Sequence, residues 1–307
     1  MDRFYVPEVP VKQYRETRVS EDRYFTHIKV VSESSMRSVF AEDDFLHIEC
    51  FRAKNPLQSP PLVFLHYLGI DKYTKSAMIR TLKNMLKGRA SLIFVALPYH
   101  LERTPAGRNS SRLFQSLNDE ELLRYFQRAV LDTQRSMDWY KSRFGDENFY
   151  IFGVSLGALV SVIAMALDSR IRKAVFVNAG GNYEKIIWSP MMRFSMYKDC
   201  SHKECYRLHQ WHMENLDIAK SVDDLHKLTA ERNCPAYDPL TFASWLKGKE
   251  ILLFSSLFDF MIPSSAKGLL RERMGGPPEI RLPVGHITIF LCWWYMLRKS
   301  KEFLYAW

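Results

Sequence analysis

The chain has 307 residues, 47% of them hydrophobic, which is enough for a substantial core in one large α/β domain or two ordinary domains. Its 13 glycines and 14 prolines, without repeats or low-complexity tracts, argue against a disordered or repeat protein. Five scattered cysteines exclude a regular disulfide framework. The net charge of +9 arises from Lys and Arg spread along the chain, so we expect no nucleic-acid partner.

The two ends of the chain carry no targeting or membrane-spanning pattern. The opening segment, MDRFYVPEVPVKQY, has charges and prolines where a secretory signal needs an apolar region. The longest apolar run near the C-terminus, Ile289 to Leu297, is about half as long as a membrane-spanning helix. We therefore expect a cytoplasmic protein.

Short runs rich in β-branched and aromatic residues alternate with longer amphipathic segments, which is typical of parallel strands joined by helices. The segments 25–31 and 38–53 are predicted to form an antiparallel hairpin at the sheet edge. Near-continuous hydrophobicity in the central runs indicates strands covered on both faces. The predicted main strands are 45–53, 61–68, 91–99, 148–154, 173–179, 250–256 and 279–284.

Two helices have clear end signals. The segment 71–88 has a periodic apolar face, and Gly88 is expected to end it. A longer helix follows Asn118, which is a good capping residue before three acidic side chains, and Gly145 is expected to close it.

Residues 180–246 interrupt the alternation. This segment has no strand-like run and is rich in His, Met, Trp and Tyr. Because it lies between two predicted core strands, we expect a helical cap over the end of the sheet within a single domain spanning residues 1–307.

The run Gly153-Val154-Ser155-Leu156-Gly157 matches the Gly-x-Ser-x-Gly nucleophile elbow. In such an elbow the backbone of the serine is strained, and the flanking glycines prevent collisions with the neighbouring strand and helix. Here a strand is predicted before the motif and a helix after it, which is the context that the motif requires. Ser155 is therefore the candidate nucleophile.

A nucleophilic serine needs a base, and the base needs an orienting acid. Asp259 and His286 each follow a predicted strand, and open α/β sheets place their chemistry at the carboxyl ends of their strands. Together with the elbow they form the candidate triad Ser155, Asp259 and His286.

From about Phe45 onward the chain resembles α/β-hydrolase fold enzymes, through the runs FLHYLG, LPYHLERTPAG, GVSLG, SLFDFMIP and VGHITIF. The loop LPYHLERTPAGR resembles one in a little-characterised branch related to α/β hydrolase domain-containing protein eighteen. The resemblance implies an eight-stranded, mostly parallel sheet with helices on both faces, a Ser-Asp-His triad and a cap after the sixth strand.

The resemblance also implies an oxyanion hole. FLHYLG occupies the place of the family's first oxyanion loop, with Tyr67 where a glycine is usual. The amide of Leu68 is the expected first donor, with Tyr67 as the alternative, and Leu156 supplies the second.

Four further residues are candidate substrate contacts. His100 and Arg103 follow the strand 91–99 and either reach a polar substrate group or hold their own loop in place. Trp188 and Met191 belong to the apolar part of the cap, which favours a hydrophobic acyl group.

Other kinds of site are not expected. His209 and His212 share a helical face, but no carboxylate partner is evident at a matching position, so we predict no metal. No glycine run forms a nucleotide-binding loop, and no cofactor is expected. The C-terminal segment, with Trp residues beside Arg298, Lys299 and Lys301, either packs on the sheet or touches a lipid surface.

The sequence thus predicts a serine hydrolase that cleaves a small-molecule carboxylic ester through an acyl-enzyme. Two alternatives stay open. The same triad could transfer the acyl group to an alcohol or amine, or the chain could be a non-catalytic, membrane-associated scaffold. The sequence does not indicate the oligomeric state.

Overall fold

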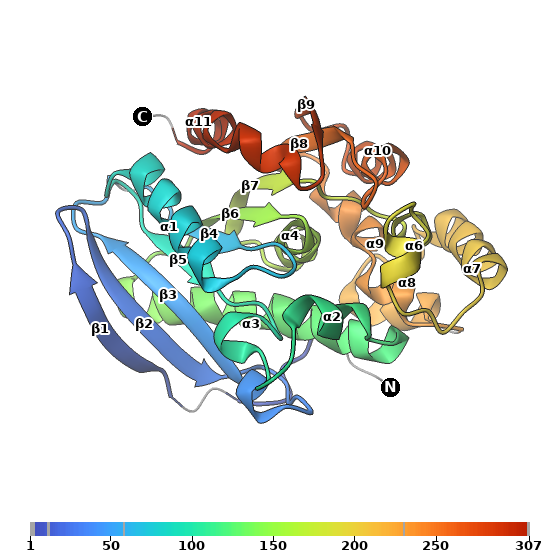
Figure 1. The fold of residues 1–307 in the computed structure, drawn as a ribbon, viewed down its shortest axis with the longest axis horizontal. Coiled ribbons are helices and arrows are strands. Elements are labelled where there is room, and N and C mark those ends of the chain that lie inside the picture. Colours follow the sequence, from blue (N-terminus) through green and yellow to red (C-terminus); the bar gives the residue numbers. More distant parts are fainter. Residues whose placement is uncertain (1–3, 11–12, 58, 230, 306–307) are drawn as a thin grey trace.

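A nine-stranded sheet in the order β1-β2-β3-β5-β4-β6-β7-β8-β9 organises the molecule (Figure 1). The computed structural model describes residues 4–10, 13–57, 59–229 and 231–305. β1, β2 and β3 are antiparallel, as are β3 and β5, and all later pairs are parallel. The strands are β1 (Arg15–Glu21), β2 (Phe25–Glu33), β3 (Phe45–Ala53), β4 (Leu62–Leu65), β5 (Leu92–Val95), β6 (Phe149–Val154), β7 (Ile171–Val177), β8 (Glu250–Phe258) and β9 (Glu279–Gly285).

Each predicted main strand and the N-terminal hairpin are confirmed, but the expected eight strands become nine. The additional strand is β1, which pairs with β2 at the edge of the sheet. All of its side chains are exposed and most are polar or charged. Such an edge strand discourages pairing with other chains, and it lacks the apolar alternation by which sequence analysis finds strands.

Helices cover both faces of the sheet, because successive side chains of a strand point to opposite sides. On β4, Leu62 and Phe64 join a core with α1 (Lys72–Leu86) and α11 (Trp293–Leu304). Val63 and Leu65 join the other core, with α3 (Asp119–Phe144), α4 (Leu156–Leu167) and α10 (Ser264–Arg273). The short elements are α2 (Ser110–Gln115) and the 3-10 turns η1 (Ala41–Asp44), η2 (Leu101–Arg103) and η5 (Thr288–Cys292).

The helix ends follow their predicted signals closely. Asn118 caps α3 in a capping box with Glu121, and Gly145 ends it at φ 86°. The first helix differs at its C-terminus. Its left-handed cap is Lys87 (φ 49°), one residue before the glycine predicted to end it.

The cap, residues 180–246, lies between β7 and β8 and contains no strand among its described residues. It lies on the side of the sheet to which the β6 and β7 arrows point (Figure 1). Its α9 packs on both α4 and α10. Its elements are α5 (Tyr183–Ile187), α6 (Met192–Ser195), α7 (His202–Asn215), η3 (Val222–Leu228), α8 (Cys234–Tyr237), α9 (Pro239–Ala243) and η4 (Ser244–Leu246).

Within the described residues, none of the helices combines the length and the hydropathy that a bilayer crossing requires.

Candidate active site

Ser155 lies on a strained turn between β6 and α4. Its φ of 52° and ψ of −116° fall outside the regions that L-residues normally occupy. Its amide donates to the carbonyl of Val177 at 2.8 Å, and its own carbonyl accepts from Ala158 and Leu159, so the turn is fixed on both sides.

The two glycines of the motif allow close backbone contacts. A Cβ on Gly157 would lie 2.2 Å from the carbonyl oxygen of Leu65 at the end of β4. A Cβ on Gly153 would lie 2.5 Å from the carbonyl oxygen of Gly157 and 2.4 Å from Ser161 Oγ. Side chains at either position would push α4 away from the sheet and displace Ser155.

The structure brings Ser155, His286 and Asp259 into one hydrogen-bonded chain. Ser155 Oγ lies 2.8 Å from His286 Nε2, and His286 Nδ1 lies 2.8 Å from Asp259 Oδ2. Asp259 directly follows β8 and His286 directly follows β9, so neighbouring parallel strands deliver the acid and the base to the same edge. The order is that of a nucleophile, its base and the base's orienting acid.

Asp259 is held as a carboxylate. Oδ1 accepts from the amides of Met261 and Ile262, each at 2.9 Å, and Oδ2 accepts from Lys267 Nζ at 2.6 Å. Burial opposes ionisation, but the hydrogen bond and charge of His286 and the ammonium of Lys267 outweigh it and lower the pKa of Asp259 to about 2. The imidazole therefore faces a negative charge at every physiological pH.

Sequence analysis missed two residues behind the acid, Lys267 and Asn178. Buried Lys267 also donates to the carbonyl of Ser256 at 3.0 Å and to Asn178 Oδ1 at 3.2 Å. Asn178 directly follows β7 and has a φ of 52°, and its Oδ1 accepts from the Ser256 amide. A lysine in an amphipathic helix ordinarily indicates a solvated face, so no local pattern points to this contact.

The loop with the first expected oxyanion donor is fixed by a buried histidine. His66 Nδ1 donates to the carbonyl of Tyr67 at 2.9 Å, and its Nε2 accepts from the Leu97 amide at 3.1 Å. This pattern requires a neutral ring, and burial keeps the pKa of His66 well below its usual value. Gly69 then turns the chain at φ 80°.

The three candidate oxyanion residues surround Ser155. Leu156 is the first residue of α4, where amides have no acceptor within the helix. Leu68 lines both cavities that reach Ser155, whereas Tyr67 lines one of them and packs its ring on Phe290. Donation by Leu68 and Leu156 stays a prediction.

Two cavities meet at Ser155 and His286. One, with a water-accessible volume of about 50 Å³, runs under the cap and is almost entirely apolar. Besides Ser155 and His286, its lining is Leu68, Phe114, Leu156, Leu159, Tyr183, Ile186, Ile187, Met192, Met196, Met261 and Ile262. The other measures about 300 Å³ and adds polar groups from Ser111, Gln115 and Asn178. The serine thus lies between a narrow apolar pocket and a wider, more polar one.

His100 and Arg103 do not line either cavity at Ser155. Both side chains are fully buried. Arg103 donates to Asp43 Oδ1 at 2.9 Å and to Asp132 Oδ2 at 2.8 Å, and His100 Nδ1 donates to the carbonyl of Pro98 at 2.8 Å. They hold their loop in place, because a buried guanidinium needs nearby carboxylates.

The two cap residues that were expected to contact the substrate, Trp188 and Met191, lie outside the cavities at Ser155. Trp188 stacks on His202 with ring centroids 4.6 Å apart, and Met191 is exposed. Neither lines a cavity at Ser155, whereas their neighbours Ile187 and Met192 do. The sequence correctly predicted an apolar cap, but a short helix presents only one of its faces inward, and which face α5 and α6 present was not readable from the sequence.

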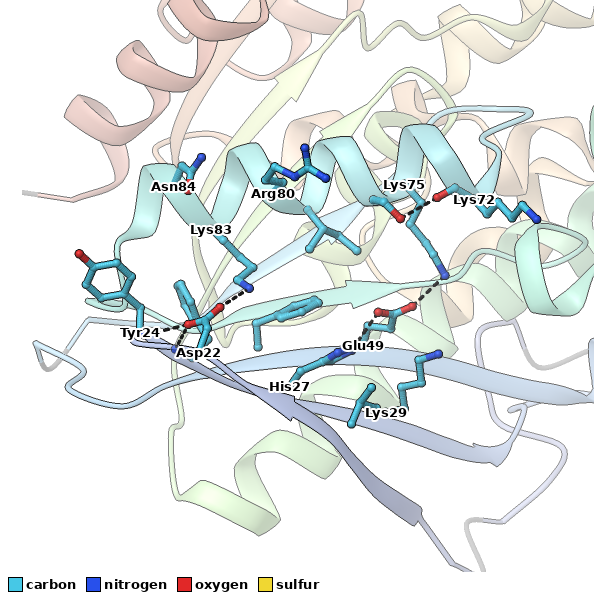
Figure 2. A pocket seen from close by; sticks show the side chains of 15 residues that line it. Asp22, Tyr24, His27, Lys29, Glu49, Lys72, Lys75, Arg80, Lys83 and Asn84 are labelled. Atoms are coloured by element: carbon cyan, nitrogen blue, oxygen red, sulfur yellow. Dashed lines mark hydrogen bonds and ion pairs between the residues drawn. The ribbon is translucent and has the colours of Figure 1, made fainter.

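A further cavity of about 650 Å³ lies between α1 and the strands β2 and β3, and its lining shares no residue with the cavities at Ser155. Figure 2 shows Lys75 directed at Glu49 and Lys83 directed at Asp22. Lys75 and Lys83 are thus each paired with a carboxylate of the same cavity, and Ser155 lies elsewhere.

Comparison with known proteins establishes the fold. No protein-family model matches the chain, and no curated protein sequence does. The structure is similar to the acetyl xylan esterase from Paenibacillus sp. R4, with a TM-score of 0.65 and 15% identity over 96% of this chain and 90% of that chain. It is also similar to a cold-adapted esterase from an Arctic intertidal metagenomic library, with a TM-score of 0.60 and 12% identity over 93% of this chain and 97% of that chain. A third match is MGS-M2, an α/β hydrolase enzyme from a Medee basin deep-sea metagenome, with a TM-score of 0.51 and 13% identity over 84% of this chain and 94% of that chain.

The chain therefore has the α/β-hydrolase fold, as the sequence predicted. Which family of proteins with this fold the chain belongs to stays a prediction.

Replacing Lys267 by Met tests whether it positions the acid. Without the ammonium the pKa of Asp259 rises from about 2, and a proton that binds the Asp259–His286 pair no longer meets a neighbouring positive charge, so the acid limb of the kcat–pH profile moves to higher pH. We expect kcat for an ester to fall roughly 10- to 100-fold, less than the ~10⁴-fold typical of removing the carboxylate's charge. KM stays within about twofold, because Lys267 does not line the cavities.

Exposed Lys247→Met is the matched control and keeps the wild-type profile. A Lys267→Met enzyme that loses activity equally at all pH values would contradict the positioning role.

Proposed function

We propose that the protein is a serine hydrolase that cleaves carboxylic esters through Ser155, His286 and Asp259. The observation that carries the proposal is the hydrogen-bonded chain of these three residues, with 2.8 Å at each step, at a serine held in a left-handed elbow. Similarity to several esterase structures supports the choice of an ester bond.

In the proposed reaction His286 Nε2 takes the Ser155 proton as Oγ attacks the ester carbonyl carbon. Charge develops on the carbonyl oxygen, where the amides of Leu68 and Leu156 stabilise it. The C–O bond to the alcohol breaks, and the alcohol leaves with the proton held by His286. Water then attacks the acyl-enzyme with His286 as base, releasing the acid and restoring Ser155.

We propose further that the acyl part is short. The apolar cavity has a volume of about 50 Å³, space for roughly four water molecules or an acyl chain of about two to four carbons. The more polar cavity of about 300 Å³ suits the alcohol part. Two of the structural neighbours are acetyl xylan esterases, which agrees with a small acyl group.

The two alternatives are less well supported. Acyl transfer to an alcohol requires the exclusion of water from the acyl-enzyme, whereas the wider cavity adjoins Ser155 and His286 directly and includes polar groups among its lining residues. A non-catalytic scaffold does not need a strained serine aligned with a histidine and an ionised aspartate, since each of these features costs stability.

A panel of p-nitrophenyl esters from acetate to palmitate tests the reaction. We expect kcat/KM to be highest for acetate to butyrate and to fall roughly 10⁴-fold or more in Ser155→Ala. The control is Ser169→Ala, an exposed serine just beyond the end of α4, which retains full activity. Unchanged turnover in Ser155→Ala, or no turnover of any ester by wild type, would refute the proposal.

Met192 and Met191 provide a paired test of the acyl pocket. Met192 is buried and lines the apolar cavity, whereas Met191 is exposed and does not. Because Met192→Ala removes about three heavy atoms from the wall, we expect the preferred acyl chain to lengthen by about two carbons. Met191→Ala should leave the preference unchanged. A changed preference in Met191→Ala together with an unchanged one in Met192→Ala would show that the acyl group does not bind in the apolar cavity.

We also propose that the ester is taken from a lipid surface. Five apolar side chains at least 60% exposed lie beside the triad or on the neighbouring C-terminal elements. Phe258 and Phe260 flank Asp259, and Ile287 follows His286. We define the apolar patch of this proposal as Phe258, Phe260, Ile287, Leu291 and Trp294, and Arg298 and Lys299 follow on α11.

Sedimentation with vesicles of phosphatidylcholine and phosphatidylglycerol tests this contact. The double variant Leu291→Ser, Trp294→Ser loses two exposed apolar side chains, and we expect its vesicle affinity to fall roughly tenfold or more. Val39→Ser, an equally exposed residue before η1, is the control and binds as wild type. Equal binding by all three proteins would exclude the patch as the membrane contact.

A further inference from the structure

A cluster of three potential ligands is buried in the cap, away from the residues that line the catalytic cavities. His209 and His212 lie one turn apart on α7, and Asp238 lies between α8 and α9. Each side chain is at most 1% exposed, and one ligand atom from each lies within 4.8 Å of the other two. Sequence analysis recognised the histidine pair but not its carboxylate, which the fold brings from 26 residues further along the chain.

The imidazole nitrogens of this cluster are short of partners. His209 Nδ1, His209 Nε2 and His212 Nδ1 are all buried and make no hydrogen bond in the described structure. A buried polar atom without a partner costs about 1–3 kcal/mol. Three such atoms on one helical turn are unusual unless something binds them.

The surrounding hydrogen bonds orient these groups as ligands. His212 Nε2 lies 2.8 Å from Thr241 Oγ1, whose hydroxyl donates to the carbonyl of Pro235, so Nε2 must carry the hydrogen. The lone pair of His212 is therefore on Nδ1, the unpartnered atom. A donor bond from the far ring nitrogen is typical of metal-binding histidines.

Asp238 is fixed in the same way. Its Oδ1 accepts from the amides of Asn182 and Leu240, and its Oδ2 accepts from the amide of Tyr183 at 2.7 Å. Oδ2 also lies 4.0 Å from His209 Nδ1. A second lone pair on Oδ2 is available to a cation between them.

The charge environment also allows a cation. The nearby positive charge is Arg273, whose guanidinium pairs with Asp217.

We propose that His209, His212 and Asp238 bind one Zn²⁺ ion. Two imidazoles and a carboxylate are a preferred zinc set, and a tetrahedral site with bonds of about 2.0–2.1 Å needs ligand atoms about 3.4 Å apart. The ligand atoms lie within 4.8 Å of one another, so side-chain rotations must draw them together by up to about 1.4 Å for the ion to bind. A small cavity of about 30 Å³ borders His209.

Zinc at this place would connect the cap to the acyl pocket. It joins α7 to the loop before α9, and the carboxylate of Asp238 holds the first amides of α5 through Asn182 and Tyr183. Tyr183 itself lines the apolar cavity at Ser155. The ion therefore has a structural role in fixing the wall of the pocket.

The test is zinc binding to the whole protein after treatment with EDTA and dialysis. We expect calorimetric titration with ZnCl₂ to give one site per chain, Co²⁺ to give the visible absorption of a tetrahedral N/O site, and MgCl₂ to give no binding. His209→Gln and His212→Gln should each weaken zinc binding at least 100-fold and abolish the zinc-dependent rise in melting temperature. His226→Gln, an exposed cap histidine, should bind as wild type.

Three results would overturn the proposal: no saturable zinc binding by wild type, one-site binding that persists in the two glutamine variants, or an octahedral Co²⁺ spectrum typical of adventitious surface binding. The wild-type Co²⁺ spectrum decides the question even if a variant fails to fold.

Discussion

The closeness of α4 to the end of β4 is the constraint on which the candidate site depends. Gly157, in the first turn of α4, packs directly against the carbonyl of Leu65. A Cβ at position 157 would lie 2.2 Å from that carbonyl oxygen, which is too close for any side chain. This contact forces the chain to leave β6 through the left-handed conformation of Ser155. It also brings the first amide of α4 beside the loop that follows β4. The same contact between α4 and β4 therefore positions the nucleophile and both candidate oxyanion donors.

A second constraint fixes the acid and base. Asp259 and His286 follow adjacent parallel strands, and the pairing of these strands fixes the backbone positions of both residues. The ammonium of Lys267 and two amides hold the carboxylate of Asp259 charged and immobile. The buried Lys267 is tolerable because its three acceptors come from Asp259, Ser256 and Asn178, so the cost of its desolvation is met by charge and hydrogen bonding.

The parts predicted from the sequence were those with a local signal. Apolar runs identified the parallel strands, Asn118 and Gly145 identified the ends of α3, and the elbow motif pointed to Ser155. The missed parts depend on contacts between distant segments. The polar edge strand β1 has no apolar pattern, Lys267 looks like a surface residue, and Asp238 joins His209 only after folding. Arg103 looked available to a substrate because its buried partners, Asp43 and Asp132, are far away in sequence.

The cap combines these local and distant effects. Its apolar composition was readable, but which side chains face Ser155 depends on the phase of short helices, so Met192 lines the pocket and Met191 does not. Its buried histidines and Asp238 lie behind the same wall, where Tyr183 contacts both regions. Acyl selectivity and cap stability are thus expected to depend on one set of contacts.

The central claim is that Ser155 is an activated nucleophile, and covalent labelling with a fluorophosphonate followed by intact-mass and peptide analysis tests it most directly. The account predicts one phosphonyl adduct per chain, located on Ser155 and lost when His286 is replaced by Ala. An unlabelled wild-type protein, or an adduct on another residue, would contradict it.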